Sequence, residues 1–333
     1  MKINQICIAG AGAIGGTLAA RLATSGQRVN VLARGRTLAA LREEGITLDD
    51  LEGRHHAMVN ASDKAEELGP QDLILVCTKA PALATMLRQI QPLLHEQTIV
   101  IPVVNGMPWW YFQGIEGRFA GERIVAADPD GELARLLPAH HLIGAVVFIT
   151  ASREGPAHVR SGNPHLMIMG EINHQLSERL EAVRELIANA GIEARATDNI
   201  RDQLWTKIIA NLTSNPLSVV TGATLEQLYS HPDLSPLVRQ MLDEILQTAA
   251  AYGARIRFDP QTIMEMGTGM GAVRTSMLQD YDNHQPLELA TIGDAVVELA
   301  SRAGFAMPIT RHVLALARFL ASQRATNNTL NNH

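Results

Sequence analysis

The chain has 333 residues, of which 46% are hydrophobic and 19% are charged, and its formal net charge is −6. This length accommodates two domains of ordinary size, each with its own core. The negative charge argues against a general binder of nucleic acid or of anionic membranes, since neither surface attracts an acidic protein. These totals still leave room for a local basic pocket that binds one small anion.

The chain has two cysteines, Cys7 and Cys77, and both stand in apolar, strand-like runs. Small buried thiols in a reducing compartment explain them better than a disulfide does. The N-terminus starts with a strand pattern rather than a secretory signal, and no run of about 18 apolar residues occurs. We therefore expect a cytoplasmic protein. The sequence leaves its oligomeric state open, a homodimer included.

Residues 1–197 alternate between strand and helix patterns. Short apolar runs predict strands over residues 3–9, 28–33, 72–77, 98–104 and 142–150, with further candidates at 166–169 and 193–196. Apolar residues at helical spacing lie between several of these runs. Strands that alternate with helices predict a doubly wound parallel sheet with right-handed crossovers. We therefore expect an N-terminal Rossmann-like α/β domain over residues 1–197.

Long helical periods dominate the rest of the chain. One apolar period ends near Gly253, a second ends near Gly304, and Pro308 is suited to start a last helix. We expect residues 198–333 to form an all-α C-terminal domain.

The segment Gly10–Gly15 matches the pattern G-x-G-x-x-G between the first predicted strand and the first predicted helix. In a dinucleotide fold the first glycine permits the tight turn, the second lets the backbone approach the pyrophosphate, and the third allows close packing of helix on strand. A plain structural turn is the other interpretation, but the strand and helix context favours dinucleotide binding. The predicted cofactor contacts are Gly10, Gly12, Ala13, Ile14 and Gly15.

The second predicted strand ends at Ala33 and is followed by Arg34-Gly35-Arg36, and no Asp or Glu occurs before Glu43. Folds that prefer NAD usually place a carboxylate there for the ribose hydroxyls, whereas an arginine pairs with the 2′-phosphate of NADP. Solvated loop arginines are common, yet two arginines and the missing acid together favour NADP(H), with Arg34 as the contact.

Polar residues follow two other predicted strands. Lys79 follows the strand at 72–77, and Asn105 follows the strand at 98–104. Ligands of open α/β sheets bind outside the carboxyl ends of strands, which gives both residues a candidate role. Both also suit surface turns, because Asn-Gly is a common turn pair.

The start of the helical region carries Lys207, Asn211 and Asn215 at four-residue spacing, which places them on one face of a helix. Their neighbours are apolar, so a polar ridge lining a cleft fits better than a solvated stripe. A lysine there is suited to donate a proton to a developing alkoxide, and amides are suited to orient a polar substrate. Further along, Ser276 offers a hydroxyl, while Glu288 reads in isolation as a helix-capping carboxylate.

The run Trp109-Trp110-Tyr111-Phe112 directly follows the Asn-Gly pair. A hydrophobic anchor between domains and a bulky wall beside a substrate are both consistent with such a cluster. No set of His, Cys, Asp and Glu shows metal-ligand spacing, so no metal site is expected.

Taken together, these stretches resemble the ketopantoate reductase (2-dehydropantoate 2-reductase) family over nearly the whole chain. The resemblance rests on Gly10–Gly15, Arg34, Lys79, Asn105-Gly106, the series Lys207, Asn211 and Asn215, and the series Ser276-Met277, Asp280 and Glu288.

The resemblance implies an enzyme in which NADPH delivers hydride to the C2 ketone of ketopantoate, giving (R)-pantoate for pantothenate biosynthesis. It implies that Lys207 is the general acid and that Glu288 holds the substrate hydroxyl and orients the lysine. By the same resemblance, Asn105, Asn211, Asn215 and Ser276 bind the substrate, and Lys79 and Asn105 lie near the cofactor.

Two alternatives stay open. One is a paralogous NADPH-dependent reductase of another 2-oxoacid or branched ketone, which would use the same lysine. The other is a non-catalytic NADPH-binding sensor, which would need no proton donor.

Overall fold

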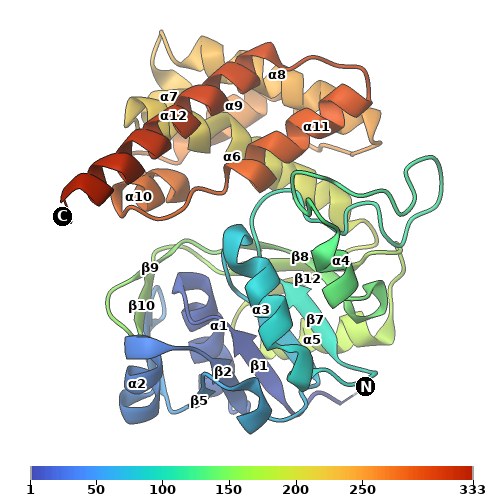
Figure 1. The fold of residues 1–333 in the computed structure, drawn as a ribbon, viewed down its shortest axis with the longest axis vertical. Coiled ribbons are helices and arrows are strands. Elements are labelled where there is room, and N and C mark those ends of the chain that lie inside the picture. The colour runs from blue at the N-terminus through green and yellow to red at the C-terminus, as the bar shows by residue number, and fades with distance from the viewer. Residues whose placement is uncertain (1, 332–333) are drawn as a thin grey trace. The chain divides into compact units, whose positions relative to one another are not determined.

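The computed structural model describes residues 2–331, with side chains to Arg324, and it divides into two compact units. Unit 1 comprises Met1–Val104, Trp110–Arg123 and Gly131–Ile200; unit 2 comprises Asn105–Trp109, Ile124–Asp130 and Arg201–His333. Unit 1 is the parallel-sheet α/β domain and unit 2 is helical (Figure 1), so the expected fold class is confirmed.

Unit 1 is built on a five-stranded parallel sheet. Its strands, in spatial order, are β5 (Asn60–Ser62), β2 (Val29–Leu32), β1 (Ile6–Ala9), β6 (Leu73–Val76) and β7 (Ile99–Pro102). Every residue of β1, β2 and β6 is buried, as expected for parallel strands that are covered on both faces. The strand order reverses between β1 and β6, so the carboxyl ends of these two strands form the switch point where open α/β sheets bind ligands.

The helices and short turns of unit 1 lie between its strands along the chain. They are α1 (Ala13–Thr24), α2 (Gly35–Glu44), η1 (Ala65–Glu67), η2 (Ala80–Ala82), α3 (Leu83–Gln89), η3 (Gln91–Leu93), α4 (Glu132–Leu136), η4 (Ala139–His141) and α5 (Glu178–Asn189).

Two smaller sheets complete unit 1. One has the order β4 (Gly53–Ala57), β3 (Ile46–Asp50), β10 (His158–Ser161) and β9 (Ala151–Arg153); the other has the order β12 (Glu193–Ala196), β11 (Leu166–Glu171) and β8 (Ile143–Phe148). The sequence pattern placed the run at 142–150 in the parallel series. In the structure β8 pairs antiparallel with β11, and a single parallel bridge from Val100 to Leu142 joins it to β7.

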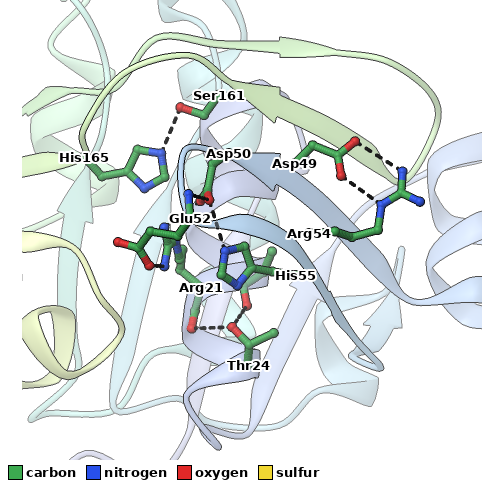
Figure 2. A network of polar contacts seen from close by, with 10 residues as sticks. Arg21, Thr24, Asp49, Asp50, Glu52, Arg54, His55, Ser161 and His165 are labelled. Atoms are coloured by element: carbon green, nitrogen blue, oxygen red, sulfur yellow. Dashed lines mark hydrogen bonds and ion pairs between the residues drawn. The ribbon is translucent and has the colours of Figure 1, made fainter.

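A buried ion pair fastens α1 to the β3–β4 hairpin (Figure 2). Arg21 of α1 lies 2.6 Å from the carboxylates of both Asp50 and Glu52. His55 lies 3.1 Å from Asp50. Burial alone would raise the pKa of Asp50, but the Glu52 N–H group, Arg21 and His55 together hold it below its usual value. The Asp50 carboxylate is therefore ionised, and it ties the hairpin to the helix that follows the glycine-rich turn.

The regular elements of unit 2 are all helical. They are α6 (Ile200–Thr221), α7 (Leu225–Ser230), α8 (Ser235–Ala251), α9 (Pro260–Gly269), α10 (Ser276–Asp282), the π-helical turn η5 (Ala290–Asp294), α11 (Ala295–Arg302) and α12 (Pro308–Asn331). Leu217, Leu228, Val238, Met241 and Val313 form part of its buried core. No helix among residues 2–331 is both long and apolar enough to cross a membrane.

Candidate functional site

The glycine-rich turn lies at the switch point of unit 1, where β1 meets β6. Gly10 has a φ of +107°, and a Cβ there would lie 2.8 Å from the Cys77 carbonyl oxygen. A Cβ on Gly15 would lie 2.0 Å from the carbonyl oxygen of Gly10. Both positions therefore exclude any side chain, because the turn packs directly on itself and on the end of β6.

Gly12 differs from its two neighbours in the motif. No atom lies within 4 Å of a Cβ built at this position, so packing of the chain on itself does not require glycine there. Open space beside the backbone is what a pyrophosphate needs in order to approach closely. The residues present therefore fit a dinucleotide.

The N-terminus of α1 is suited to an anion. Gly12 is the N-cap residue and supplies no side-chain cap, and the first turn contains no acidic residue. The first N–H groups of a helix have no partner within the helix, and the helix dipole favours negative charge at this end. The N–H groups of Ala13 and Ile14 are among those available to a phosphate.

Arg34 lies two residues after β2 and is the N-cap residue of α2, again without a side-chain cap. Both Arg34 and Arg36 are exposed. An exposed guanidinium at the end of this strand is suited to pair with a phosphate on the ribose.

Lys79 and Asn105 have different structural settings. Lys79 follows β6 and precedes η2, and it is half-buried at the same sheet edge as the glycine-rich turn. Asn105 is half-buried and belongs to unit 2. There the Met107 N–H donates to the Thr291 carbonyl at 2.8 Å, and a Cβ on Gly106 would lie 2.5 Å from the Thr291 carbonyl carbon. The Asn105 loop is thus held against the η5 turn.

Lys207 lies on α6 and carries an altered pKa. Part of its side chain is accessible, yet burial of its ammonium group lowers the pKa to about 8, and the negative charge of Glu288 opposes that fall. A lysine that titrates near neutral pH is suited to proton transfer, because both of its protonation states are accessible.

The two asparagines follow Lys207 along α6. Asn211 is half-buried, whereas Asn215 is 3% exposed. The side-chain Nδ2 of Asn215 is buried and has no hydrogen-bond partner within the described residues. An unsatisfied buried donor costs about 1–3 kcal/mol, so it points to a partner outside the chain. The face of α6 that carries Lys207, Asn211 and Asn215 is therefore not a solvated stripe.

Glu288 and Ser276 occupy the starts of two further helical segments. Glu288 is 9% exposed and immediately precedes the segment that contains η5. Ser276 is exposed as the first residue of α10. Its neighbour Thr275 is the buried member of the pair: its hydroxyl accepts the Leu278 N–H at 3.1 Å and contacts the Ser218 hydroxyl at 2.6 Å. Thr275 caps α10, a role that the sequence motif did not distinguish from that of Ser276.

The aromatic run is buried throughout. In unit 1, Trp110 packs over Gly144, where a Cβ would lie 2.6 Å from the indole ring, and Phe112 packs against Phe119 with ring centroids 5.4 Å apart. Trp109 belongs to unit 2, and its Nε1 is buried without a hydrogen-bond partner among the described residues. The rings of Trp110 and Phe112 therefore contribute to the packing of unit 1. The described part of the chain contains no cluster of three or more His, Cys, Asp or Glu that could hold a metal.

Comparison with known proteins covers both units. Residues 6–174 match the family model described as ketopantoate reductase PanE/ApbA, and residues 199–321 match the model for its C-terminal part. A 2-dehydropantoate 2-reductase from Mesorhizobium japonicum is 36% identical over 321 residues, which cover 96% of this chain and 98% of that protein.

Solved structures match over a similar length. A protein from Ralstonia solanacearum MolK2 has a TM-score of 0.93 at 37% identity, covering 97% of this chain and 99% of its own. The 2-dehydropantoate 2-reductase from Geobacter metallireducens GS-15 has a TM-score of 0.83 at 28% identity, with 94% and 98% covered.

Proposed function

The chain belongs to the ketopantoate reductase family, and from this membership and the chemistry of its residues we propose that it reduces ketopantoate to (R)-pantoate with NADPH. The family consists of oxidoreductases that act on CH–OH donors with a nicotinamide cofactor. When bound, the reduced nicotinamide supplies the hydride to the C2 ketone. The remaining steps belong to side chains of this chain.

Lys207 supplies the proton in this proposal. A carbonyl that receives hydride becomes an alkoxide, and an ammonium group beside its oxygen both stabilises the developing charge and protonates it. The pKa of about 8 makes Lys207 a better acid than an exposed lysine while leaving most of it protonated at neutral pH. The negative charge of Glu288 favours the charged form of Lys207, so a larger fraction of the lysine is protonated at neutral pH.

In this proposal, other polar side chains of unit 2 bind the substrate. We assign the substrate carboxylate and hydroxyl to Asn105, Asn211, Asn215 and Ser276, with Glu288 accepting a hydrogen bond from the hydroxyl. The observation that supports this most directly is Asn215, whose buried Nδ2 has no partner within the described chain. A carboxylate oxygen would satisfy that donor.

In this proposal, the glycine-rich turn of unit 1 binds the cofactor. The pyrophosphate would lie against Gly12 and the N-terminus of α1, with Gly10 and Gly15 shaping the turn. Arg34 would pair with the 2′-phosphate, which favours NADPH over NADH. Lys79, at the same sheet edge, and Asn105 would contact the nicotinamide half.

The desolvated Lys207 with Glu288 at its side carries this proposal, because a structural or sensing role needs no such proton donor. We expect Lys207→Ala to lower kcat for ketopantoate by about a hundredfold or more, the usual scale of a lost general acid, while NADPH still binds. Lys64→Ala is the matched control, since that lysine is exposed on unit 1. Near-normal turnover in Lys207→Ala would refute the assignment.

A panel of 2-oxoacids, assayed with NADPH and with NADH, tests the substrate and the cofactor. We expect ketopantoate with NADPH to give the highest kcat/KM. A higher value for another branched 2-oxoacid would replace the named substrate but keep Lys207 as the acid. Binding of NADPH without turnover of any acid would favour a sensor.

A further inference from the structure

Thr291 carries a buried hydroxyl with no hydrogen-bond partner. The residue is 8% exposed, and its Oγ1 is buried and unsatisfied among the described residues. Leaving such a group unpaired costs about 1–3 kcal/mol, so native chains rarely leave a buried hydroxyl without a partner.

Other helical threonines show what a threonine hydroxyl normally does. Each donates to the carbonyl four residues earlier in its own helix: Thr17, Thr24, Thr206, Thr213, Thr221, Thr248 and Thr268. Thr291 lies in the π-helical turn η5, and the residue four positions earlier, Leu287, precedes the helix. The Glu288 carbonyl, three positions earlier, accepts the Ile292 N–H. The irregular turn therefore leaves the Thr291 hydroxyl without its usual acceptor, and such turns are frequent at functional sites.

The position of Thr291 links it to the residues assigned to the substrate. Glu288 lies three residues earlier on the same segment and acts electrostatically on Lys207. The Thr291 carbonyl holds the Met107 N–H, and its backbone packs on Gly106, next to Asn105. Thr291 thus stands between Glu288 and the Asn105 loop.

Hydrogen-bond chemistry indicates which ligand group the hydroxyl would meet. An ionised carboxylate only accepts hydrogen bonds, so Glu288 satisfies the O–H of a substrate hydroxyl but not its oxygen lone pairs. A second hydroxyl that is free to donate would complete the set. We propose that Thr291 is a specificity-determining residue, whose hydroxyl donates to the oxygen of a hydroxyl on the substrate chain and so selects hydroxylated 2-oxoacids. This inference rests on the proposed function, because it assumes that Glu288 accepts from that same group.

Thr291→Val tests the inference, since valine keeps the shape and the backbone contacts but lacks the hydroxyl. The variant and the unmodified chain are assayed with ketopantoate and with 3,3-dimethyl-2-oxobutanoate, two acids that differ only in the 4-hydroxyl. We expect kcat/KM for ketopantoate to fall about tenfold, the worth of one hydrogen bond. We expect kcat/KM for the deoxy acid to stay within about twofold. Equal losses for both acids, or no loss for either, would overturn the inference.

Thermal unfolding without ligand supplies a second readout. Thr291→Val removes an unsatisfied polar group, so we expect its Tm to be equal to or higher than that of the unmodified chain. The matched control is Thr248→Val: Thr248 is fully buried, but its hydroxyl donates to the Glu244 carbonyl. We expect this control to have a lower Tm and unchanged discrimination between the two acids. A Tm loss in Thr291→Val as large as that in Thr248→Val would show that the hydroxyl is already satisfied in the chain, against the inference.

Failure of the proposed function gives a different result. If the unmodified chain reduced neither acid, ketopantoate would be the wrong substrate. The unmodified chain and Thr291→Val would then be compared on the best hydroxylated acid of the panel and on the same acid without its hydroxyl. If the ratio of the two kcat/KM values were equal in both proteins, the role of Thr291 would be refuted.

Discussion

The charge of Glu288 raises the pKa of Lys207 against the burial that lowers it, and the balance leaves Lys207 titrating at about 8. The two residues lie on different segments of unit 2, Lys207 within α6 and Glu288 just before η5. The two effects act in opposite directions on the proposed proton donor. Burial without the carboxylate would lower the pKa of Lys207 further, whereas the carboxylate without burial would leave the lysine a weaker acid.

This balance predicts how Glu288→Gln changes the pH profile. Removing the negative charge leaves desolvation unopposed, so the pKa of Lys207 should fall below 8. Because the lysine must be protonated to act as the acid, the alkaline limb of kcat for ketone reduction should move to lower pH. Profiles between pH 5 and 10 measure the shift. The exposed residue Glu226 provides the control variant Glu226→Gln, and an alkaline limb that is the same in all three proteins would exclude the coupling.

The same pKa predicts a stability effect of Lys207→Met. In the folded chain the pKa of Lys207 is about 8, below the ordinary value of 10.5, so folding disfavours its charged form. The unfolded chain binds more protons between these two values, and the free energy of unfolding therefore rises with pH across that window. The destabilisation is fully present below pH 8 and absent above about 10.5.

We therefore expect Lys207→Met to have a higher Tm than the unmodified chain at pH 7, with the difference fading as the pH rises from 8 towards 10.5. Thermal unfolding of both proteins over this range measures it. A Tm difference that does not depend on pH would show that packing, rather than the buried charge, separates the two proteins. The expected gain in stability with loss of turnover is typical of active-site residues.

The sequence predicted most of the buried strands of unit 1, but it missed an exposed hairpin and the pairing direction of one strand. The strands β1, β2, β6 and β7 were predictable because they are wholly buried and read as continuous apolar runs. The β3–β4 hairpin was missed because β4, Gly-Arg-His-His-Ala, is largely exposed and has no apolar alternation. The antiparallel direction of β8 was also missed, since a buried run carries no information about its partner's direction.

The candidate site was partly predictable for a similar reason. Spacing along one helix or one turn identified the glycine motif and the Lys207 ridge, and both family models confirm the resemblance built on them. The unsatisfied hydroxyl of Thr291 could not be predicted from the sequence, because it depends on the local π-helical geometry. The attachment of the Asn105 loop to Thr291 depends on a contact between distant parts of the chain, which no local pattern encodes.

Arg34→Ala tests the cofactor preference. Loss of one charge-assisted pair with a 2′-phosphate should weaken NADPH binding by about 1.5–3 kcal/mol and leave NADH nearly unchanged. Calorimetry or fluorescence titration with each cofactor gives the two Kd values. Arg28→Ala is the matched control, since Arg28 is exposed at the opposite end of the same strand. Equal losses for both cofactors would rule out the 2′-phosphate contact.

Gly12 and Gly15 should respond to alanine in opposite ways, because the structure gives them different reasons to be glycine. A Cβ on Gly15 would lie 2.0 Å from the carbonyl oxygen of Gly10, so Gly15→Ala must displace the turn or α1 and should lower the Tm.

A Cβ on Gly12 meets no atom within 4 Å, and the φ of Gly12 is −75°, which alanine adopts freely. Gly12→Ala should therefore keep the Tm while its methyl group holds the pyrophosphate away from the backbone. We expect its Kd for NADPH and for NADH to rise by a similar factor of about ten or more, since both cofactors share the pyrophosphate. Unchanged cofactor affinity in a stable Gly12→Ala protein would place the pyrophosphate elsewhere.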